Sequence, residues 1–239
     1  DSLETLDPNS ALTKNVPKEL KEHFGWQDKA RKLAEKVGKG TLSYGFFGVN
    51  MASTGMGKTR ANAKIMTAIG RQTGRVRFSV ALGLRVLTLQ TGKEFQDELK
   101  LSDEELAIAV GGTAIKQLFE NQQLHRTQGK AGEKTPVEDM GSESQEGLLD
   151  PDLYVHYKGG LEEHSLSCWT KKENGLDKIL LAPVLVSTID HLMPATEGTK
   201  GGKQIPATLR LLTSDLVLDE PDDFGLDDLP ALCRLVHWA

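Results

Sequence analysis

Short apolar runs alternate along the chain with longer stretches in which apolar residues recur every three or four positions. The short runs have the length and the β-branched or aromatic content of buried strands. They span residues 44–52, 76–82, 106–112, 183–188 and 215–220. Helical stretches separate most of these runs. Because parallel strands need long crossover connections, the alternation predicts an α/β fold with a mainly parallel central sheet.

The helical stretches are bounded by glycine and proline. A helix over 17–24 should begin at Pro17 and end at Gly25, and a second should cover 26–38, which has one apolar face. Further helices are expected over 58–71, 85–99, 207–213 and 226–238. Residues 1–16 are polar and show no period, and 197–204 has the composition of a loop.

Domain organisation is predicted from these elements and from composition. We expect an N-terminal helical segment over residues 1–40 and one globular domain over 41–239, since 239 residues with 38% hydrophobic side chains can bury a sizeable core. Hydrophobicity falls sharply over about 122–146, which predicts an insertion. No apolar segment resembles a membrane span and the two cysteines are far apart, so a cytoplasmic protein without a membrane partner is expected.

Charge is distributed unevenly. The net charge of −5 argues against a globally basic nucleic-acid binder. Between Lys58 and Lys93, however, there are eight basic residues and no acid, whereas Asp215 to Asp228 holds seven acids and no base. The sign of the charge in each segment therefore says more about binding partners than the net charge of the chain does.

The stretch "ASTGMGKT", residues 52–59, has the order of a phosphate-binding loop that opens a helix. Backbone amides of the glycine turn would surround phosphate oxygens, Lys58 would reach the β and γ phosphates, and the hydroxyl of Thr59 would bind Mg²⁺. The expected nucleotide-binding residues in this loop are Ser53, Thr54, Gly55, Met56, Gly57, Lys58 and Thr59. Ala52 stands where the usual pattern has its first glycine.

An acidic motif, "LVLDEPDDF" (216–224), ends the last apolar run. We expect Asp219 to hold Mg²⁺ and Glu220 to orient and deprotonate a water molecule. Together with Lys58 these two acids are the expected catalytic residues. The hypothesis requires the glycine loop and the acids to meet at one edge of one sheet, where open α/β sheets bind ligands.

Intermediate segments resemble strand-contacting motifs of superfamily 2 helicases. "ALGLRVLTLQ" (81–90) resembles A-P-T-R-x-L-x-x-Q, a glycine pair follows the next strand, and "VLVSTIDHL" (184–192) resembles a later motif. The nucleic-acid contacts that this resemblance implies are Arg85, Gln90, Gly111, Gly112, Thr188 and Asp190. Gln27, in "GWQDKA", stands where such motors place a glutamine that reads the adenine edge.

Five stretches together resemble one family, the CRISPR-associated helicase-nucleases of type I-F systems. They are "GFFGVNMASTGMGKTRANAKIM", "RFSVALGLRVLTLQTG", "LSDEELAIAVGG", "LLAPVLVSTIDHLMPATE" and "LVLDEPDDF". The resemblance implies a three-layer RecA-like P-loop NTPase fold, incomplete on its C-terminal side, with ATP and Mg²⁺ as cofactors. It implies single-stranded DNA and an RNA-guided surveillance complex as partners, and a second RecA-like domain and a nuclease domain elsewhere in the full-length chain.

Because the second RecA-like domain would supply an arginine finger, we expect these residues alone to bind ATP and Mg²⁺ weakly and to hydrolyse ATP slowly or not at all. Two other hypotheses remain open. One is a P-loop small-molecule kinase or switch ATPase that is indifferent to DNA. The other is a truncated fragment that docks onto a larger complex without catalysis.

Overall fold

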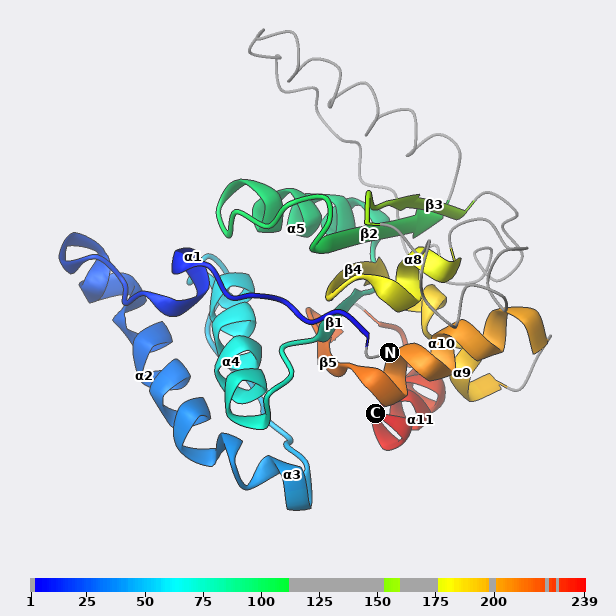
Figure 1. Cartoon of the computed structure of the whole chain (residues 1–239), viewed down its shortest axis with the longest axis horizontal. Coiled ribbons are helices and arrows are strands. Elements are labelled where there is room, and N and C mark those ends of the chain that lie inside the picture. Colours follow the sequence, from blue (N-terminus) through cyan, green and yellow to red (C-terminus); the bar gives the residue numbers. More distant parts are fainter. Residues whose placement is uncertain (1–2, 112–152, 160–175, 198–200, 222–223, 227) are drawn as a thin grey trace, which may run out of the picture.

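The computed structural model describes most of the chain and contains one five-stranded sheet (Figure 1). The described residues are 3–111, 153–159, 176–197, 201–221, 224–226 and 228–239. In the sheet the strands follow the order β3-β2-β4-β1-β5. Their bounds are β1 Phe78–Leu82, β2 Leu106–Gly111, β3 Leu153–His156, β4 Val184–Thr188 and β5 Asp215–Leu218.

Four of the five strands are parallel, which confirms the expected mainly parallel α/β fold. β1 lies between β4 and β5, and β2 pairs with the other side of β4. β3 runs antiparallel to β2 at the edge of the sheet. The carboxyl ends of β1, β2, β4 and β5 therefore share one edge.

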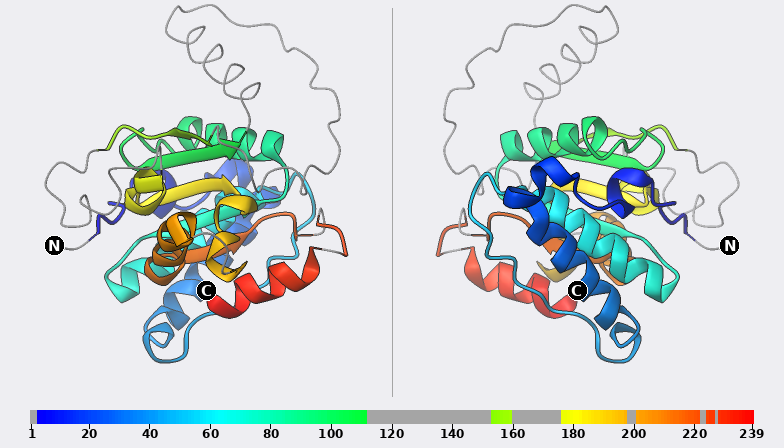
Figure 2. Two further views of the ribbon diagram at one scale, coloured as in Figure 1. Left: turned by 90° about the vertical axis from the view of Figure 1, so that its right-hand side faces the viewer. Right: turned by 90° about the vertical axis from the view of Figure 1, so that its left-hand side faces the viewer.

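Side-chain alternation in the strands creates two apolar layers, one on each face of the sheet. Phe78, Val80 and Leu82 of β1 face a cluster completed by residues of α4 and α5, whereas Ala81 faces a second cluster. The helices of the first face are α4 Lys58–Thr73 and α5 Arg85–Asp97; those of the second face are α8 Leu176–Leu181, α9 Pro194–Glu197, α10 Gly201–Thr213 and α11 Leu229–Trp238 (Figure 2). The result is helix, sheet and helix in three layers.

The N-terminal helix α2, Lys21–Gly38, packs on the outer side of α4. It runs without interruption through Gly25, so the predicted break there is wrong. The expected first helix divides into the short 3-10 turn η1, Lys18–Leu20, and the first turn of α2. A helical glycine costs only about 1 kcal/mol, which packing against α4 offsets. Gly38 allows the close approach, since a Cβ there would lie 2.7 Å from Gln72 Cγ.

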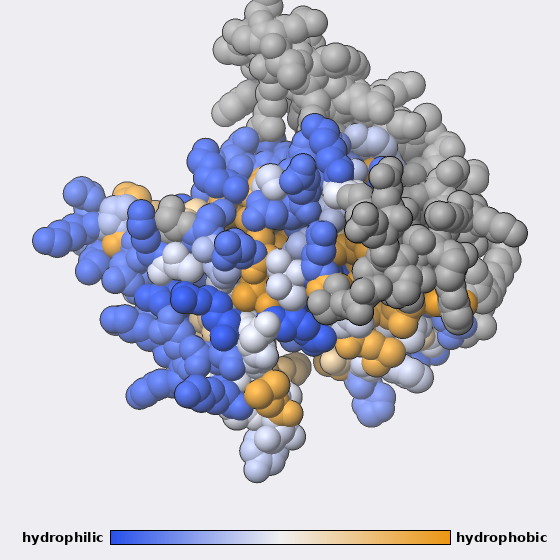
Figure 3. All heavy atoms as spheres, viewed as in Figure 1, coloured by the Kyte–Doolittle hydropathy of each residue, from blue (hydrophilic) through white to orange (hydrophobic). Residues whose placement is uncertain are grey.

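The solvent side of α2 is mixed, because Leu33 is 62% and Val37 40% exposed. Figure 3 shows a mainly hydrophilic surface in this part of the molecule. The apolar face expected from the sequence is buried only in part, since Ala34 packs against Ala68 and Ile69 whereas Leu33 and Val37 remain exposed. The short helices α1 Ser10–Thr13 and α3 Thr41–Tyr44 precede and follow it.

The strand predicted over residues 44–52 does not form. Tyr44 ends α3, and the residues that follow are irregular and largely exposed, with Phe47 80% and Met51 89% exposed. Within the described chain, residues 46–51 make no backbone–backbone hydrogen bond, and β5 pairs only with β1. Residues of strand composition thus remain irregular and leave the outer edge of β5 unpaired within the described chain, because composition alone does not make a strand.

Residues 3–16 are more ordered than their polar composition predicts. Leu6, Leu12 and Val16 are buried, and the N–H of Leu6 donates to the carbonyl of Val76. Three isolated apolar side chains therefore anchor a polar segment to the domain.

Two arginines are buried beneath the sheet without an ion-pair partner among the described residues. The guanidiniums of Arg77 and Arg210 donate instead to the last carbonyls of α8. The acceptors are Leu180 and Leu181 for Arg77, and Ile179 and Ala182 for Arg210. A helix end leaves these carbonyls unpaired and carries partial negative charge, so the two cations cap α8. Burial lowers the pKa of Arg77 to about 10 and also lowers the pKa of Arg210, with Arg77 adding repulsion.

Most of the other predicted helices form. The helices over 58–71 and 85–99 form, and that predicted over 226–238 begins at Leu229. The helix around 207–213 extends back to Gly201, into part of the predicted loop. β3 and α8 were not predicted. The predicted insertion, 122–146, lies outside the described residues, and the division after residue 40 stays a prediction. Among the described helices, none has the length and apolar character needed to cross a membrane.

Candidate functional site

The glycine loop is a tight turn that leads directly into α4. The N–H of Met56 donates to the carbonyl of Ser53 at 3.2 Å, and Gly55, third in this four-residue turn, has φ +79°. A positive φ at the third position is what a type II turn requires, and glycine adopts it without strain. Gly57 is also left-handed, at φ +71°, and caps the helix. Both glycines are therefore required by backbone geometry.

The start of α4 is suited to an anion. Its cap, Gly57, offers no side chain to the first amides of the helix, and the first bond of the helical ladder is from Ala61 N–H to the Gly57 carbonyl at 3.1 Å. Amides at a helix start and the positive end of the helix dipole favour negative charge at this point. A Cβ on Gly55 would meet no atom of the described chain within 4 Å, so the turn faces open space. Thr59 lies in the first turn of the helix.

The acidic motif lies at the carboxyl end of β5. Asp219 N–H donates to the Ala81 carbonyl at 3.0 Å and the residue is 7% exposed. The next residue, Glu220, has a left-handed backbone with φ +49°, unusual for a residue other than glycine. This conformation goes together with an ion pair in which Glu220 Oε1 lies 2.9 Å from Lys58 Nζ. The loop and the acids thus meet at one edge of the sheet.

Burial and neighbouring charges perturb the acids at this edge. Burial raises the pKa of Asp219 above its ordinary value, the adjacent Glu220 carboxylate raises it further, and Lys58 opposes both effects. The pKa of Glu94, on α5, is also raised, first by burial and then by Glu98 and Asp219, with Arg60 opposing. A cation would relieve this excess of negative charge.

The side chains at this edge suit Mg²⁺, which keeps water and phosphate ligands, better than a metal ion bound by protein side chains alone. Within the described chain no three His, Cys, Asp or Glu side chains form a metal-binding cluster. Mg²⁺ is usually bound through one or two carboxylates together with substrate phosphates and water. Asp219 and the hydroxyl of Thr59 are the residues expected to hold it.

Helix α2 places two consecutive side chains on the glycine loop. Trp26 Nε1 donates to the Met56 carbonyl and Gln27 Nε2 donates to the Gly57 carbonyl, each at 3.2 Å. Gln27 is 2% exposed, and its Oε1 has no hydrogen-bond partner among the described residues. Gln27 is therefore beside the loop, as its predicted role requires, with an acceptor atom that this part of the chain leaves unused. The adenine contact stays a prediction.

The predicted strand-contacting residues mostly follow the carboxyl ends of parallel strands. Arg85 begins α5 shortly after β1, Gly111 ends β2, and Thr188 ends β4. Asp190 lies in the 3-10 turn η3, Ile189–His191, and Gln90 is exposed on α5. Thr188 is only 1% exposed, so its hydroxyl is not at the surface. Gly112 lies outside the described residues.

Several residues that support the site were not identified from the sequence. Phe224 packs on Gly83, where a Cβ would lie 3.0 Å from the ring, so the acidic motif rests on the turn after β1. Asn50 Nδ2 donates to Asn62 Oδ1 at 2.8 Å and ties the residues before the loop to α4. Trp26 gave no signal because one indole in an amphipathic helix is indistinguishable from a packing residue.

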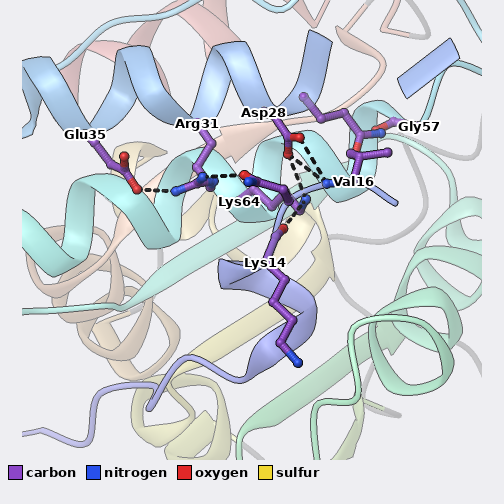
Figure 4. Close-up of polar contacts among 9 residues, drawn as sticks. Lys14, Val16, Asp28, Arg31, Glu35, Gly57 and Lys64 are labelled. Atoms are coloured by element: carbon purple, nitrogen blue, oxygen red, sulfur yellow. Dashed lines mark hydrogen bonds and ion pairs between the residues drawn. The ribbon is translucent and has the colours of Figure 1, made fainter. Parts of the chain in front are cut away.

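A buried ion pair holds α2 against α4 (Figure 4). Lys64 Nζ lies 3.6 Å from Asp28 Oδ1 and donates to the Lys14 carbonyl at 2.9 Å. Both carboxylate oxygens of Asp28 accept the N–H of Val16 at 3.0 Å. Burial lowers the pKa of Lys64, and Asp28 partly offsets that effect. These contacts fix the helix that carries Trp26 and Gln27.

Comparison with known proteins gives relatives for nearly the whole chain, although no protein-family model matches it. The chain is 51% identical over 216 residues to the CRISPR-associated nuclease/helicase Cas3 subtype I-F/YPEST of Pectobacterium atrosepticum, covering 90% of this chain and 19% of the relative. It is 48% identical over 238 residues to the protein of the same name from Pseudomonas aeruginosa, covering 99% of this chain and 21% of the relative. The chain thus spans about one fifth of the length of these relatives. The resemblance to the CRISPR-associated helicase-nucleases of type I-F systems is therefore confirmed, and the chain is homologous to part of a Cas3 protein of subtype I-F/YPEST.

Proposed function

We propose that this chain is the first RecA-like, ATP-binding domain of a motor that moves along single-stranded DNA during CRISPR interference. The names of the two relatives support a helicase-type role in a CRISPR system. The nuclease, a second RecA-like domain and the surface that binds an RNA-guided surveillance complex would belong to other parts of the full-length protein.

One observation carries the proposal. The ion pair between Lys58 Nζ and Glu220 Oε1, 2.9 Å long, joins the glycine loop to the acidic motif at the carboxyl edge of the parallel strands. Residues far apart in the sequence are brought together where such sheets bind nucleotides. A glycine turn without function would not require acids at the same place.

The chain's own residues divide the work at this edge. The turn over 53–57 and the first amides of α4 bind phosphate oxygens, and Lys58 exchanges its contact with Glu220 for the β and γ phosphates. Bound Mg²⁺ would neutralise phosphate charge, with Asp219 and Thr59 holding it. Glu220, released from Lys58, orients a water molecule and accepts its proton. For an adenine contact, Gln27 would have to turn its Oε1, which is buried without a partner among the described residues, towards the adenine amino group.

The arrangement also suggests where DNA passes. Arg85, Gly111 and Asp190 follow the ends of β1, β2 and β4, so they lie along the same edge of the sheet as the nucleotide site. A basic side chain and a glycine backbone are suited to contact phosphates of a strand. Nucleotide-dependent movement at this edge would thereby reach the DNA.

Isothermal titration of the 239-residue chain with ATP and Mg²⁺ tests the nucleotide site. Lys58→Ala should weaken binding about 10- to 100-fold, since hydrogen bonds to a charged group contribute about 1.5–3 kcal/mol. Lys39→Ala, which removes an exposed lysine just after α2, is the matched control and should bind as the wild type does. Equal affinity of all three proteins would contradict the proposal.

Binding of a labelled single strand of DNA at several salt concentrations tests the motor assignment. Affinity should fall steeply as salt rises, because phosphate contacts release counterions, and Arg85→Ala should reduce the slope. ATP binding with no measurable affinity for DNA would instead favour a small-molecule kinase or switch ATPase.

A further inference from the structure

The two peptide groups that precede Lys58 are held from one side by α2. Trp26 Nε1 donates to the Met56 carbonyl and Gln27 Nε2 donates to the Gly57 carbonyl. The Gly57 carbonyl also accepts the N–H of Ala61. In the described part of the chain, Trp26 is the single donor to the Met56 carbonyl.

Holding a carbonyl fixes the direction of an amide. A trans peptide group is planar, so its C=O and N–H point in opposite directions. With the Met56 oxygen directed at Trp26, the N–H of Gly57 points away from α2. In the same way, directing the Gly57 oxygen towards Gln27 aims the N–H of Lys58 away from that helix.

The loop needs such a support because its own backbone is permissive. Gly55 and Gly57 both have positive φ, and glycine moves between regions of φ and ψ at little cost. A peptide group flanked by Gly57 could therefore rotate and replace an amide with a carbonyl. Such a rotation would place a partial negative charge where phosphate should bind.

The support itself is firmly attached. Asp28, the residue after Gln27, accepts the N–H of Val16 and pairs with buried Lys64 of α4 (Figure 4). The absence of a Cβ at Gly57 lets α2 approach, since such an atom would lie 2.6 Å from Gln27 Nε2 and 3.5 Å from the ring of Phe24. Trp26 thus belongs to a helix that is held in place, and it contacts a loop whose glycines allow backbone rotation.

We propose that Trp26 is a positioning residue of the phosphate cradle: its indole N–H holds the Met56–Gly57 peptide so that the Gly57 amide faces the polyphosphate of a bound nucleoside triphosphate. The inference rests on the proposed ATP site and deepens it. Trp26 touches the loop and not the ligand, so its effect should appear in the binding of phosphates and be independent of the base.

Replacing Trp26 by Phe removes the N–H and keeps an aromatic ring. In the 239-residue chain, Trp26→Phe should weaken binding of ATP with Mg²⁺ about 5- to 10-fold, the factor expected for one lost hydrogen bond. Binding of inorganic tripolyphosphate with Mg²⁺ should weaken by the same factor, since the cradle and not the base site is changed. Trp238→Phe, at an exposed position on α11, should leave both affinities unchanged.

Fluorescence gives a second readout that leaves Trp26 in place. The chain has three tryptophans, so the double variant Trp169→Phe, Trp238→Phe reports Trp26 alone. Its emission should shift or change intensity when tripolyphosphate binds. This measurement decides the question even if Trp26→Phe does not fold.

The outcomes separate the two proposals. If the wild type binds neither ATP nor tripolyphosphate, the ATP site is wrong and this inference with it. If the wild type binds both and folded Trp26→Phe binds them equally well, this inference alone is overturned. A Trp26 emission that is unchanged at saturating tripolyphosphate would also overturn it.

Discussion

Breaking the buried pair Asp28–Lys64 should destabilise the α2–α4 interface. Lys64 is 1% exposed, and its ammonium contacts Asp28 and the Lys14 carbonyl. Lys64→Met keeps the length of the side chain and removes the charge. It leaves the Asp28 carboxylate buried with the Val16 N–H as its remaining hydrogen-bond donor among the described residues.

Removing one partner of a buried pair typically costs about 3–5 kcal/mol. The Val16 bond to both carboxylate oxygens places Lys64→Met near the lower limit, at about 3 kcal/mol. For a chain of this size that loss corresponds to a fall of roughly 6–12 °C in melting temperature. Asp28→Asn keeps an acceptor for Val16 but leaves Lys64 without its counter-ion, and should cost about 2 kcal/mol.

The double variant measures the pair directly. Once Lys64 is replaced by methionine, the neutral amide of Asp28→Asn is no worse than a buried carboxylate, so the double variant should cost about 3 kcal/mol, not the sum of about 5. Urea unfolding followed by circular dichroism, without ligand and at fixed pH and salt, gives the free energies of the wild type and all three variants. Lys36→Met, on the exposed side of α2, should change stability by less than about 0.5 kcal/mol. Single costs that add within about 0.5 kcal/mol would refute the coupling.

Further predictions concern the sheet and the nucleotide edge. Arg210→Met should cost about 3–5 kcal/mol in urea unfolding, because five buried oxygens each lose a donor, although those of Pro183 and Ser79 keep a second partner. Exposed Arg234→Met should be nearly neutral, and similar costs for the two variants would contradict the capping of α8. Asp219→Asn should raise the ligand-free melting temperature at pH 7 but remove the Mg²⁺-dependent part of the stabilisation by ATP. For the wild type, the whole stabilisation by ATP is about 2.7 kcal/mol at an ATP concentration of about 100 times Kd. Because the native pKa of Asp219 is raised, its contribution to stability is full below the ordinary carboxyl pKa and is lost as pH rises through the raised value. The free energy of unfolding without ligand should therefore fall as pH rises over that window in the wild type, and should fall less in Asp219→Asn. Acidification through the same window should weaken Mg²⁺ binding, measurable by titration at two pH values. Steady-state phosphate release by the 239-residue chain should be slow and unaffected by single-stranded DNA, and rapid DNA-stimulated release would refute the need for a second domain.

Local sequence patterns predicted most helices and strands, and the errors arise where contacts between distant residues decide the structure. β1, β2, β4 and β5 were predictable because each is a short apolar run that the sheet buries. The run at 44–52 has similar composition but does not join the free edge of β5, which composition cannot reveal. Gly25 failed as a helix terminator because packing against α4, a long-range effect, outweighs its weak local preference.

The site divides in the same way. The glycine loop and the acidic motif were predictable because adjacent residues form each one, and the parallel order places them at a common edge. Their contact through Lys58 and Glu220 follows from that topology. The contribution of Trp26 was not predictable, since it depends on how α2 is rotated on α4 and on the direction of a single carbonyl.

Two exposed features affect how the purified molecule behaves. One is the outer edge of β5, which pairs with no strand of the described chain, and the other is the exposed segment that begins at the end of α3. Tyr44, Phe47, Val49 and Met51 present exposed apolar side chains close together in sequence, and an unpaired strand edge is a template for addition of another chain. Purified material should therefore form oligomers as its concentration rises. A charged residue at Phe47 would be a first choice for keeping the preparation monodisperse, since that side chain is 80% exposed.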